Sequence, residues 1–218
     1  MTLHLNSQAD LEAAIHALVK RDPRLEPIFK LAGMPALRRR EPGFVGLAHI
    51  VCGQQLSTAS AAAIWGRLAA AYDPFTPQAL IRARSDRLAR LGLSGAKVRA
   101  LKEIARAIAG GALDCDALPD MAADAAHQAL CAVHGIGPWT ADIYLLFCLG
   151  HPDAWPAGDL ALQEAARLAF DLPARPNHKE AGALAEPWRP WRGVAARLLW
   201  AYYRALKKRD VVPVQPAK

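Results

Sequence analysis

Apolar residues recur along most of the chain with the spacing of amphipathic helices, and the alternating patterns that predict β-strands are almost absent. Glycine and proline interrupt this spacing at short intervals, which is typical of short helices joined by tight turns. The stretch 44–52 illustrates the pattern, because Phe44, Leu47, Ala48 and Val51 fall on one helical face. We therefore predict an all-α fold.

Helix boundaries follow from capping residues and from the positions of proline and glycine. The expected helices cover 10–20 with Asp10 as cap, 44–52, the Ala-rich stretch capped by Ser57 up to Tyr72, a short helix with Pro77 in its first turn, 94–108 closed by Gly110 and Gly111, 120–132, 138–149, 160–170 with Asp159 as N-cap, a helix begun by Asn177, and a last helix opened by Pro190 and ending near Lys208. No internal repeat interrupts this series.

The segment from Leu130 to Asp142, LCAVHGIGPWTAD, connects two of these helices. Gly135 and Gly137 allow a tight turn and a close approach of the backbone, so that amides at the start of the next helix can face a phosphate. This is the signature of a helix-hairpin-helix motif, here at about 130–149, which binds the DNA backbone without reading sequence. A turn whose glycines only satisfy geometry is the alternative.

Additional motifs narrow this interpretation. Asp159 ends the segment W-P-A-G-D, one helix beyond the hairpin, and the combination resembles the helix-hairpin-helix (HhH-GPD) DNA glycosylase superfamily. The closer resemblance is to its 3-methyladenine DNA glycosylase II branch, in a short form without the N-terminal β-rich domain. The matching motifs are FVGLAHIVCGQQLS at 44–57, VHGIGPWTAD at 133–142, GDLAL at 158–162 and EPWRPWRG at 186–193, and the resemblance covers about 44–205.

The resemblance implies a single glycosylase unit over 1–218, made of two helical lobes with a DNA-binding cleft. Lobe one would comprise about 45–150, with the central helices and the hairpin, and lobe two about 1–44 plus 151–210. The implied enzyme is a monofunctional N-glycosylase, a hydrolase that flips alkylated bases of the 3-methyladenine type out of double-stranded DNA and begins base excision repair. A non-catalytic DNA-binding module and a glycosylase/lyase for oxidised or mismatched bases remain as alternatives.

Asp159 is the candidate catalytic residue. As the glycosidic bond stretches, the sugar gains positive charge, which a fixed carboxylate stabilises, and the same group can orient or deprotonate the attacking water. An ordinary helix N-cap is the alternative, and the two roles are compatible. Arg192, beside Trp191, is expected to brace the loop that carries Asp159.

Aromatic rings are expected around the flipped base because an alkylated purine such as 3-methyladenine is positively charged. Trp139 and Trp200 are the candidate pocket residues, with a core position as the alternative for Trp139. In members of the superfamily that also cut the strand, a lysine stands two residues beyond the second hairpin glycine, which is the position of Trp139 here. Tryptophan has no amine to form a Schiff base, so hydrolysis without strand cleavage is predicted.

The candidate DNA contacts lie in three segments. They are Gly135, Ile136, Gly137 and Thr140 in the hairpin, Gln54 and Gln55 in the G-Q-Q-L-S segment, and Lys97 at the start of a later helix. The resemblance implies that this segment carries the residue that fills the gap left by the flipped nucleotide, and Gln55 is the candidate; the alternative is that both glutamines merely cap the helix of Ser57 or solvate the turn. Lys97 is a candidate phosphate contact, and a solvated lysine is the alternative.

Charge and composition agree with this assignment. The 218 residues include 27 Lys and Arg against 20 Asp and Glu, a net charge of +7, which favours a polyanionic partner. The chain has neither an apolar run long enough to span a membrane nor the basic and apolar N-terminus of a signal peptide. We expect a monomer in a bacterial-type cytoplasm, associated with the nucleoid through DNA and not with membranes.

Neither a metal site made of side chains nor another cofactor is expected. The four cysteines are widely spaced without a C-x-x-C pair, so neither zinc nor an iron–sulfur cluster has a recognisable ligand set, and the histidines lack metal-like spacing. The cysteines are expected to be buried free thiols. The family resemblance implies that the hairpin can hold a sodium or potassium ion through backbone carbonyls.

Overall fold

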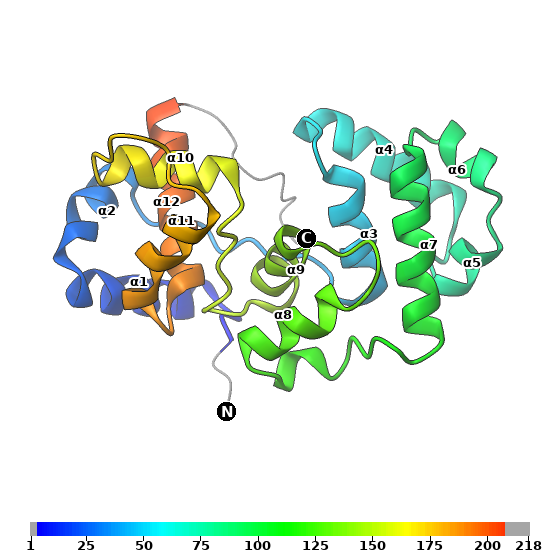
Figure 1. The fold of residues 1–218 in the computed structure, drawn as a ribbon, viewed down its shortest axis with the longest axis horizontal. Coiled ribbons are helices and arrows are strands. Elements are labelled where there is room, and N and C mark those ends of the chain that lie inside the picture. The colour runs from blue at the N-terminus through cyan, green and yellow to red at the C-terminus, as the bar shows by residue number, and fades with distance from the viewer. Residues whose placement is uncertain (1–3, 208–218) are drawn as a thin grey trace. The chain divides into compact units, whose positions relative to one another are not determined.

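The structure, a computed structural model, describes residues 4–207 and confirms the all-α prediction (Figure 1). Twelve α-helices and four short helical turns occur in this range, and it contains no strand. In chain order they are α1 (Gln8–Arg21), η1 (Pro23–Leu25), α2 (Glu26–Ala32), α3 (Gly43–Gly53), α4 (Thr58–Ala71), α5 (Pro77–Arg82), α6 (Ser85–Arg90), α7 (Gly95–Ala109), η2 (Leu118–Asp120), α8 (Ala123–Cys131), α9 (Pro138–Tyr144), η3 (Leu145–Leu149), α10 (Leu160–Ala169), α11 (His178–Ala185), η4 (Glu186–Trp188) and α12 (Arg192–Lys207).

The described chain forms two compact units. Arg40–Leu149 forms the first, which we call the hairpin unit. The segments 4–39 and 150–207 form the second, which we call the aspartate unit because it contains Asp159. The chain therefore leaves the aspartate unit once and returns to it after η3.

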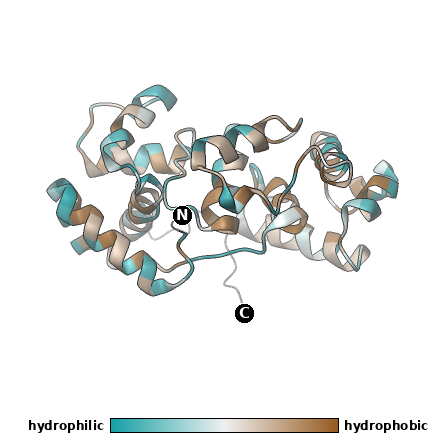
Figure 2. Cartoon of the chain, turned by 90° about the horizontal axis from the view of Figure 1, so that it is seen from below, coloured by the Kyte–Doolittle hydropathy of each residue, from teal (hydrophilic) through white to brown (hydrophobic). Residues whose placement is uncertain are grey.

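A continuous helical stretch lies at the centre of the hairpin unit. α9 runs directly into the π-helical turn η3, and every residue over 140–149 is buried. α3 and α8 pack against α9, α4 and α7 pack against α3, and α5 and α6 pack against α7 (Figure 1). α7 shows why such helices form, because Val98, Leu101, Ile104 and Ala105 make one buried apolar face. Figure 2 shows apolar and polar residues on different sides of such helices.

α12 is the central helix of the aspartate unit. Its first ten residues, 192–201, are all buried, and α1, α2 and α10 pack around it. Only an apolar or well-paired helix tolerates burial on all sides. The stretch GVAARLLWA is apolar apart from Arg197, which is 4% exposed and donates to the backbone carbonyl of Arg38.

Most predicted helices are confirmed, but several boundaries are corrected. Asp10 is not the N-cap of α1: Ser7 is, and Asp10 completes a capping box by accepting the backbone N–H of Ser7. The last helix begins at Arg192, two residues after Pro190, and its expected end at Lys208 lies outside the described residues. α8 starts three residues later than expected, after η2.

Candidate functional site

The hairpin turn is built on Gly135. This residue has a φ of +97°, and a Cβ atom here would lie 2.8 Å from both Cα and Cβ of Ala100 in α7. The turn is closed by Ile136 N, which donates to Val133 O at 3.0 Å. Both the backbone conformation and the packing on α7 therefore require glycine at 135.

Gly137 has a different environment. It is the N-cap of α9 with an extended backbone (φ −87°, ψ 169°), and a Cβ atom here would have no neighbour within 4 Å. Its carbonyl accepts the N–H of Ala141 at 3.0 Å, the first turn of α9. Trp139 and Thr140 lie in the first turn of α9, before Ala141, where backbone N–H groups have no partner within the helix and point out along its axis. No contact among residues 4–207 requires glycine at 137, and the space beside it is open to a ligand.

The hairpin side chains are mostly turned inward. Ile136 and Thr140 are 4% and 2% exposed, and the Thr140 hydroxyl accepts Nε2 of Gln54 at 2.8 Å. Ile136 and Thr140 therefore remain candidates for DNA contact through their backbone groups and not through their side chains. Trp139 is half-buried.

The Gln54–Gln55 loop presents one strained residue. Gln54 ends α3, and Gln55, which follows it, is exposed with a φ of 56°. A left-handed backbone is uncommon outside glycine and costs about 1–2 kcal/mol. Ser57, the predicted cap, then begins α4 by accepting the N–H of Ser60. The turn thus holds the Gln55 side chain at the surface of the unit.

Lys97 does not occupy the exposed position expected of a phosphate contact. Its Nζ donates to the carbonyls of Cys52 and Gln54 at 2.9 and 2.8 Å, and partial burial lowers its pKa below the usual value. Both acceptors lie at the C-terminal end of α3, where carbonyls lack helical partners and the helix dipole favours a cation. Its ammonium group is therefore bound to the G-Q-Q-L-S segment of its own unit.

Asp159 is the N-cap of α10, as predicted, and is 8% exposed. Its Oδ1 accepts two hydrogen bonds, from Leu162 N at 2.8 Å and from the indole Nε1 of Trp200 at 3.1 Å. Trp200 comes from α12 and is itself buried. One of the two candidate pocket tryptophans thus holds the candidate catalytic carboxylate directly.

Leu160 was missed by sequence reasoning. It follows Asp159 in the first turn of α10 and is 62% exposed, the most exposed of the large apolar residues described. The buried face of α10 includes Leu162, Ala165 and Ala166, so position 160 falls away from it. The spacing of the buried residues along α10 could have shown from the sequence that Leu160 lies on the exposed face. An apolar contact surface therefore adjoins the carboxylate.

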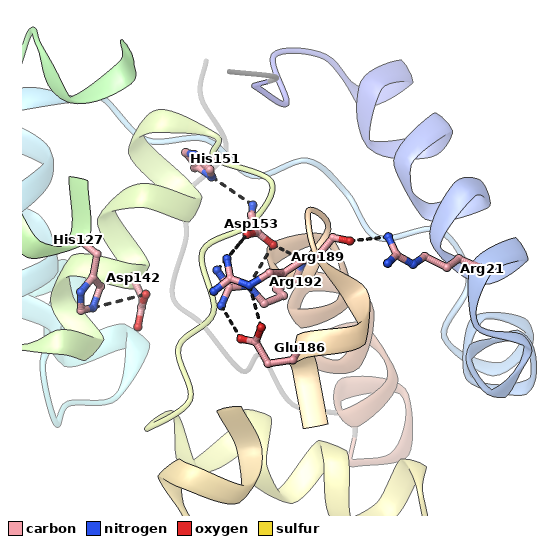
Figure 3. A network of polar contacts seen from close by, with 8 residues as sticks. All are labelled: Arg21, His127, Asp142, His151, Asp153, Glu186, Arg189 and Arg192. Atoms are coloured by element: carbon pink, nitrogen blue, oxygen red, sulfur yellow. Dashed lines mark hydrogen bonds and ion pairs between the residues drawn. The ribbon is translucent and has the colours of Figure 1, made fainter. Parts of the chain in front are cut away.

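Buried ion pairs hold the loop that leads to Asp159 (Figure 3). Arg192 binds Asp153 through two nitrogens, Nε to Oδ1 at 3.0 Å and Nη2 to Oδ2 at 2.9 Å, and both side chains are 10% exposed. Arg189 adds a 3.0 Å contact to Oδ2 of Asp153. Pro152 O also accepts Gly193 N at 2.7 Å. The bracing role predicted for Arg192 is confirmed, and its partner Asp153 is a second residue that sequence reasoning missed.

Residues 4–207 offer neither a side-chain metal site nor a membrane span. They contain no group of three or more His, Cys, Asp or Glu side chains suited to a metal ion. No helix in this range is long and apolar enough to cross a membrane.

Comparison with known proteins places this geometry in a family context. The family model described as HhH-GPD superfamily base excision DNA repair protein matches residues 48–190. The probable bifunctional transcriptional activator/DNA repair enzyme AlkA of Mycobacterium tuberculosis is 32% identical over 206 residues, which cover 90% of this chain and 40% of that protein. The chain thus spans less than half the length of this relative.

This chain matches a larger share of its relatives in fission yeast. DNA-3-methyladenine glycosylase 1 of Schizosaccharomyces pombe is 28% identical over 232 residues, with both chains fully covered. The solved structure of S. pombe 3-methyladenine DNA glycosylase (Mag1) in complex with abasic DNA matches with a TM-score of 0.80 at 26% identity, and covers 91% of this chain and 98% of that one.

Proposed function

Because the chain belongs to the HhH-GPD superfamily of base excision DNA repair proteins, we propose that it is a monofunctional DNA glycosylase that removes alkylated bases from duplex DNA. The observation that carries this proposal is the buried carboxylate of Asp159, fixed by Leu162 N and the Trp200 indole. A helix N-cap needs only the bond from Leu162 N, and the second bond, from the Trp200 indole, fixes the carboxylate beyond that need. The name of the fission yeast relative, DNA-3-methyladenine glycosylase 1, supports alkylated purines as the substrate class.

Binding would begin at the hairpin. The open space beside Gly137 lets a phosphate approach the amides at the start of α9. Such contacts are with the backbone of DNA and are independent of sequence, so they serve damaged and undamaged duplexes alike. The net charge of +7 adds attraction to the polyanion.

Chemistry requires that the damaged nucleotide leave the stack, at a cost of a few kcal/mol. The exposed Gln55 is our candidate to fill the gap in the duplex. Trp139, which is half-buried, is our candidate ring for stacking on a positively charged base. Trp200 is 6% exposed and its indole holds the Asp159 carboxylate, which the exposed apolar Leu160 follows. In this proposal, selectivity for alkylated purines depends on these aromatic contacts.

Asp159 would then stabilise the positive charge that develops on the sugar. Because its hydrogen bonds are already formed, the carboxylate needs little reorganisation as the bond breaks. The bond from C1′ to the base nitrogen breaks, the base keeps the electron pair, and the oxygen of a water molecule bonds to C1′. The proton of that water passes to Asp159.

Backbone carbonyls of the hairpin suit a hard monovalent cation. The turn 133–137 offers oxygen donors from its main chain, and the only side chain in it with a metal-binding atom is that of His134. We propose that any ion bound there is sodium or potassium, which would add positive charge near the phosphate. Activity on DNA would place the protein at the chromosome, in the cytoplasm of a bacterial-type cell.

A panel of duplexes, each with one methylated purine, ethenoadenine or hypoxanthine, tests the function. We expect release of the free base and an intact strand that breaks only after alkali, because Trp139 replaces the lysine needed for lyase chemistry. Release is measured by chromatography and strand integrity by gel electrophoresis. A covalent adduct trapped by borohydride would contradict the monofunctional assignment, and tight binding without any release would favour a DNA-binding module.

A further inference from the structure

Two lysines on α7 make the same kind of contact with two different helices. Lys97 donates to Cys52 O and Gln54 O at the end of α3. Lys102 donates to Ile81 O and Ala83 O at the end of α5. Each ammonium thus caps carbonyls that the neighbouring helix leaves unbonded. The two sites differ in what lies beyond the capped end, because α3 leads into the Gln55 loop.

Gln54 is held from two sides. Its carbonyl accepts the Lys97 ammonium at 2.8 Å, and its side-chain Nε2 donates to the Thr140 hydroxyl at 2.8 Å. Thr140 is 2% exposed and belongs to the first turn of α9, whose amides we assign to phosphate binding. Gln54 therefore connects α7 with the start of α9.

The same segment of α7 also contacts the hairpin turn. Ala100 lies three residues after Lys97, on the same side of the helix, and packs closely on Gly135. One turn of α7 thus fixes the end of α3 through Lys97 and the hairpin through Ala100. Gln55, with its left-handed backbone, is the next residue along the chain from Gln54.

We propose that Lys97 is a positioning residue that, with Gln54 and Thr140, fixes the Gln55 loop at a set place relative to the phosphate-binding hairpin. This rests on the proposed function. Gln55 fills the gap in the duplex only if it enters at the right distance from the phosphate that the hairpin holds. Lys97 therefore acts on base extrusion through Gln55, not on DNA by direct contact.

The test compares Lys97→Met with Lys102→Met, which removes an equivalent cap from α5. For a lesion paired in a normal duplex, we expect Lys97→Met to slow single-turnover base release about tenfold, the factor for one net hydrogen bond. For the same lesion in single-stranded or mispaired DNA the loss should be within about threefold, because extrusion is cheaper there. Lys102→Met should leave both rates at the wild-type level.

Two further measurements separate positioning from a phosphate contact. In a Gln55→Ala background, Lys97→Met should slow single-turnover base release from the paired lesion by less than about twofold more. The reason is that the effects of residues that act through one another are not additive. The slope of log affinity for undamaged duplex against log salt should stay unchanged, whereas loss of one phosphate contact would reduce it by about 0.9. Lys97→Arg should restore paired-substrate release, since it keeps a cationic donor.

Thr140→Val provides a second route if Lys97→Met does not fold. It removes the acceptor of the Gln54 side chain and should cause the same loss on paired substrates only. An equal loss on paired and unpaired lesions, a smaller salt slope, or full additivity with Gln55→Ala would overturn the inference. Absence of base release by the wild-type protein would overturn the proposed function itself, which is a different result.

Discussion

Replacing each hairpin glycine with alanine separates what the fold needs from what DNA binding needs. At Gly135 the new methyl group would sit 2.8 Å from Cα and Cβ of Ala100, on a backbone with φ +97°. A non-glycine residue in that conformation costs about 1–2 kcal/mol, and overpacking adds about 1–3 kcal/mol. We expect Gly135→Ala to lower the free energy of unfolding by about 2–5 kcal/mol.

At Gly137 the same substitution should leave the fold intact. The backbone is extended and a Cβ atom meets nothing within 4 Å, so the gain of about 0.4–1 kcal/mol from restricting the unfolded chain should roughly offset the poorer N-capping by alanine, and stability should change by less than about 1 kcal/mol. The open space is where we place the phosphate. Loss of one hydrogen bond to a charged group, about 1.5–3 kcal/mol, would weaken DNA binding about 10- to 100-fold.

Urea unfolding measures the stability of both variants, and binding isotherms at one fixed salt concentration measure their affinity for DNA. Gly137→Ala should weaken binding to damaged and undamaged duplexes equally, because the hairpin reads no base. Wild-type affinity in Gly137→Ala, or a loss confined to damaged DNA, would refute the assignment of the phosphate site. Gly137→Val, with a larger side chain, should show a greater loss of affinity.

Two other predictions concern stability. Arg192→Met removes the two-nitrogen contact with Asp153 and should lower the free energy of unfolding by about 2–4 kcal/mol, less than for a fully unpaired ion because Arg189 remains; urea unfolding measures it. Burial lowers the pKa of His49 to about 4, below its unfolded value near 6.5, so the unfolded state binds more protons and stability should fall between pH 6.5 and 4. His49→Phe should remove this pH dependence. Urea unfolding at pH 7 and pH 4.5 gives the difference in the free energy of unfolding, and an equal difference in the wild type and in His49→Phe would contradict the assignment.

The helix caps show how far the sequence predicts the fold. Ser57, Ser94, Asp159 and Asn177 each precede an apolar-periodic stretch, and each caps the expected helix. Asp10 was misassigned because a capping box places an acidic residue three positions after the true N-cap, Ser7. From the sequence alone, such a residue resembles an N-cap itself. α2 and α6 were missed because they are short and no side chain caps their first turn, whereas α5, which is equally short, begins with a capping Thr76 followed by Pro77.

The candidate site was predictable where its chemistry is local and not where it depends on distant partners. The hairpin glycines and Asp159 lie in contiguous motifs, so their positions could be read from the chain. Lys97 binds carbonyls 43 and 45 residues away, and Trp200 donates to Asp159 across 41 residues. Periodicity fixes which face of a helix is buried but not which atoms meet there. From the sequence, Lys97 was therefore open to two interpretations, a phosphate contact or a solvated side chain, and neither included the carbonyl partners that the fold gives it.

Asp159→Asn tests the central claim most directly. Asparagine caps helices as well as aspartate does, and its oxygen can still accept from Leu162 N and Trp200 Nε1, so the fold should be kept. Single-turnover base release from an alkylated duplex should fall at least about 100-fold, as for other preorganised electrostatic groups. Affinity for abasic DNA should stay equal or rise, because one negative charge is lost. Near-wild-type base release by the folded variant would contradict the account and leave Asp159 as a helix cap alone.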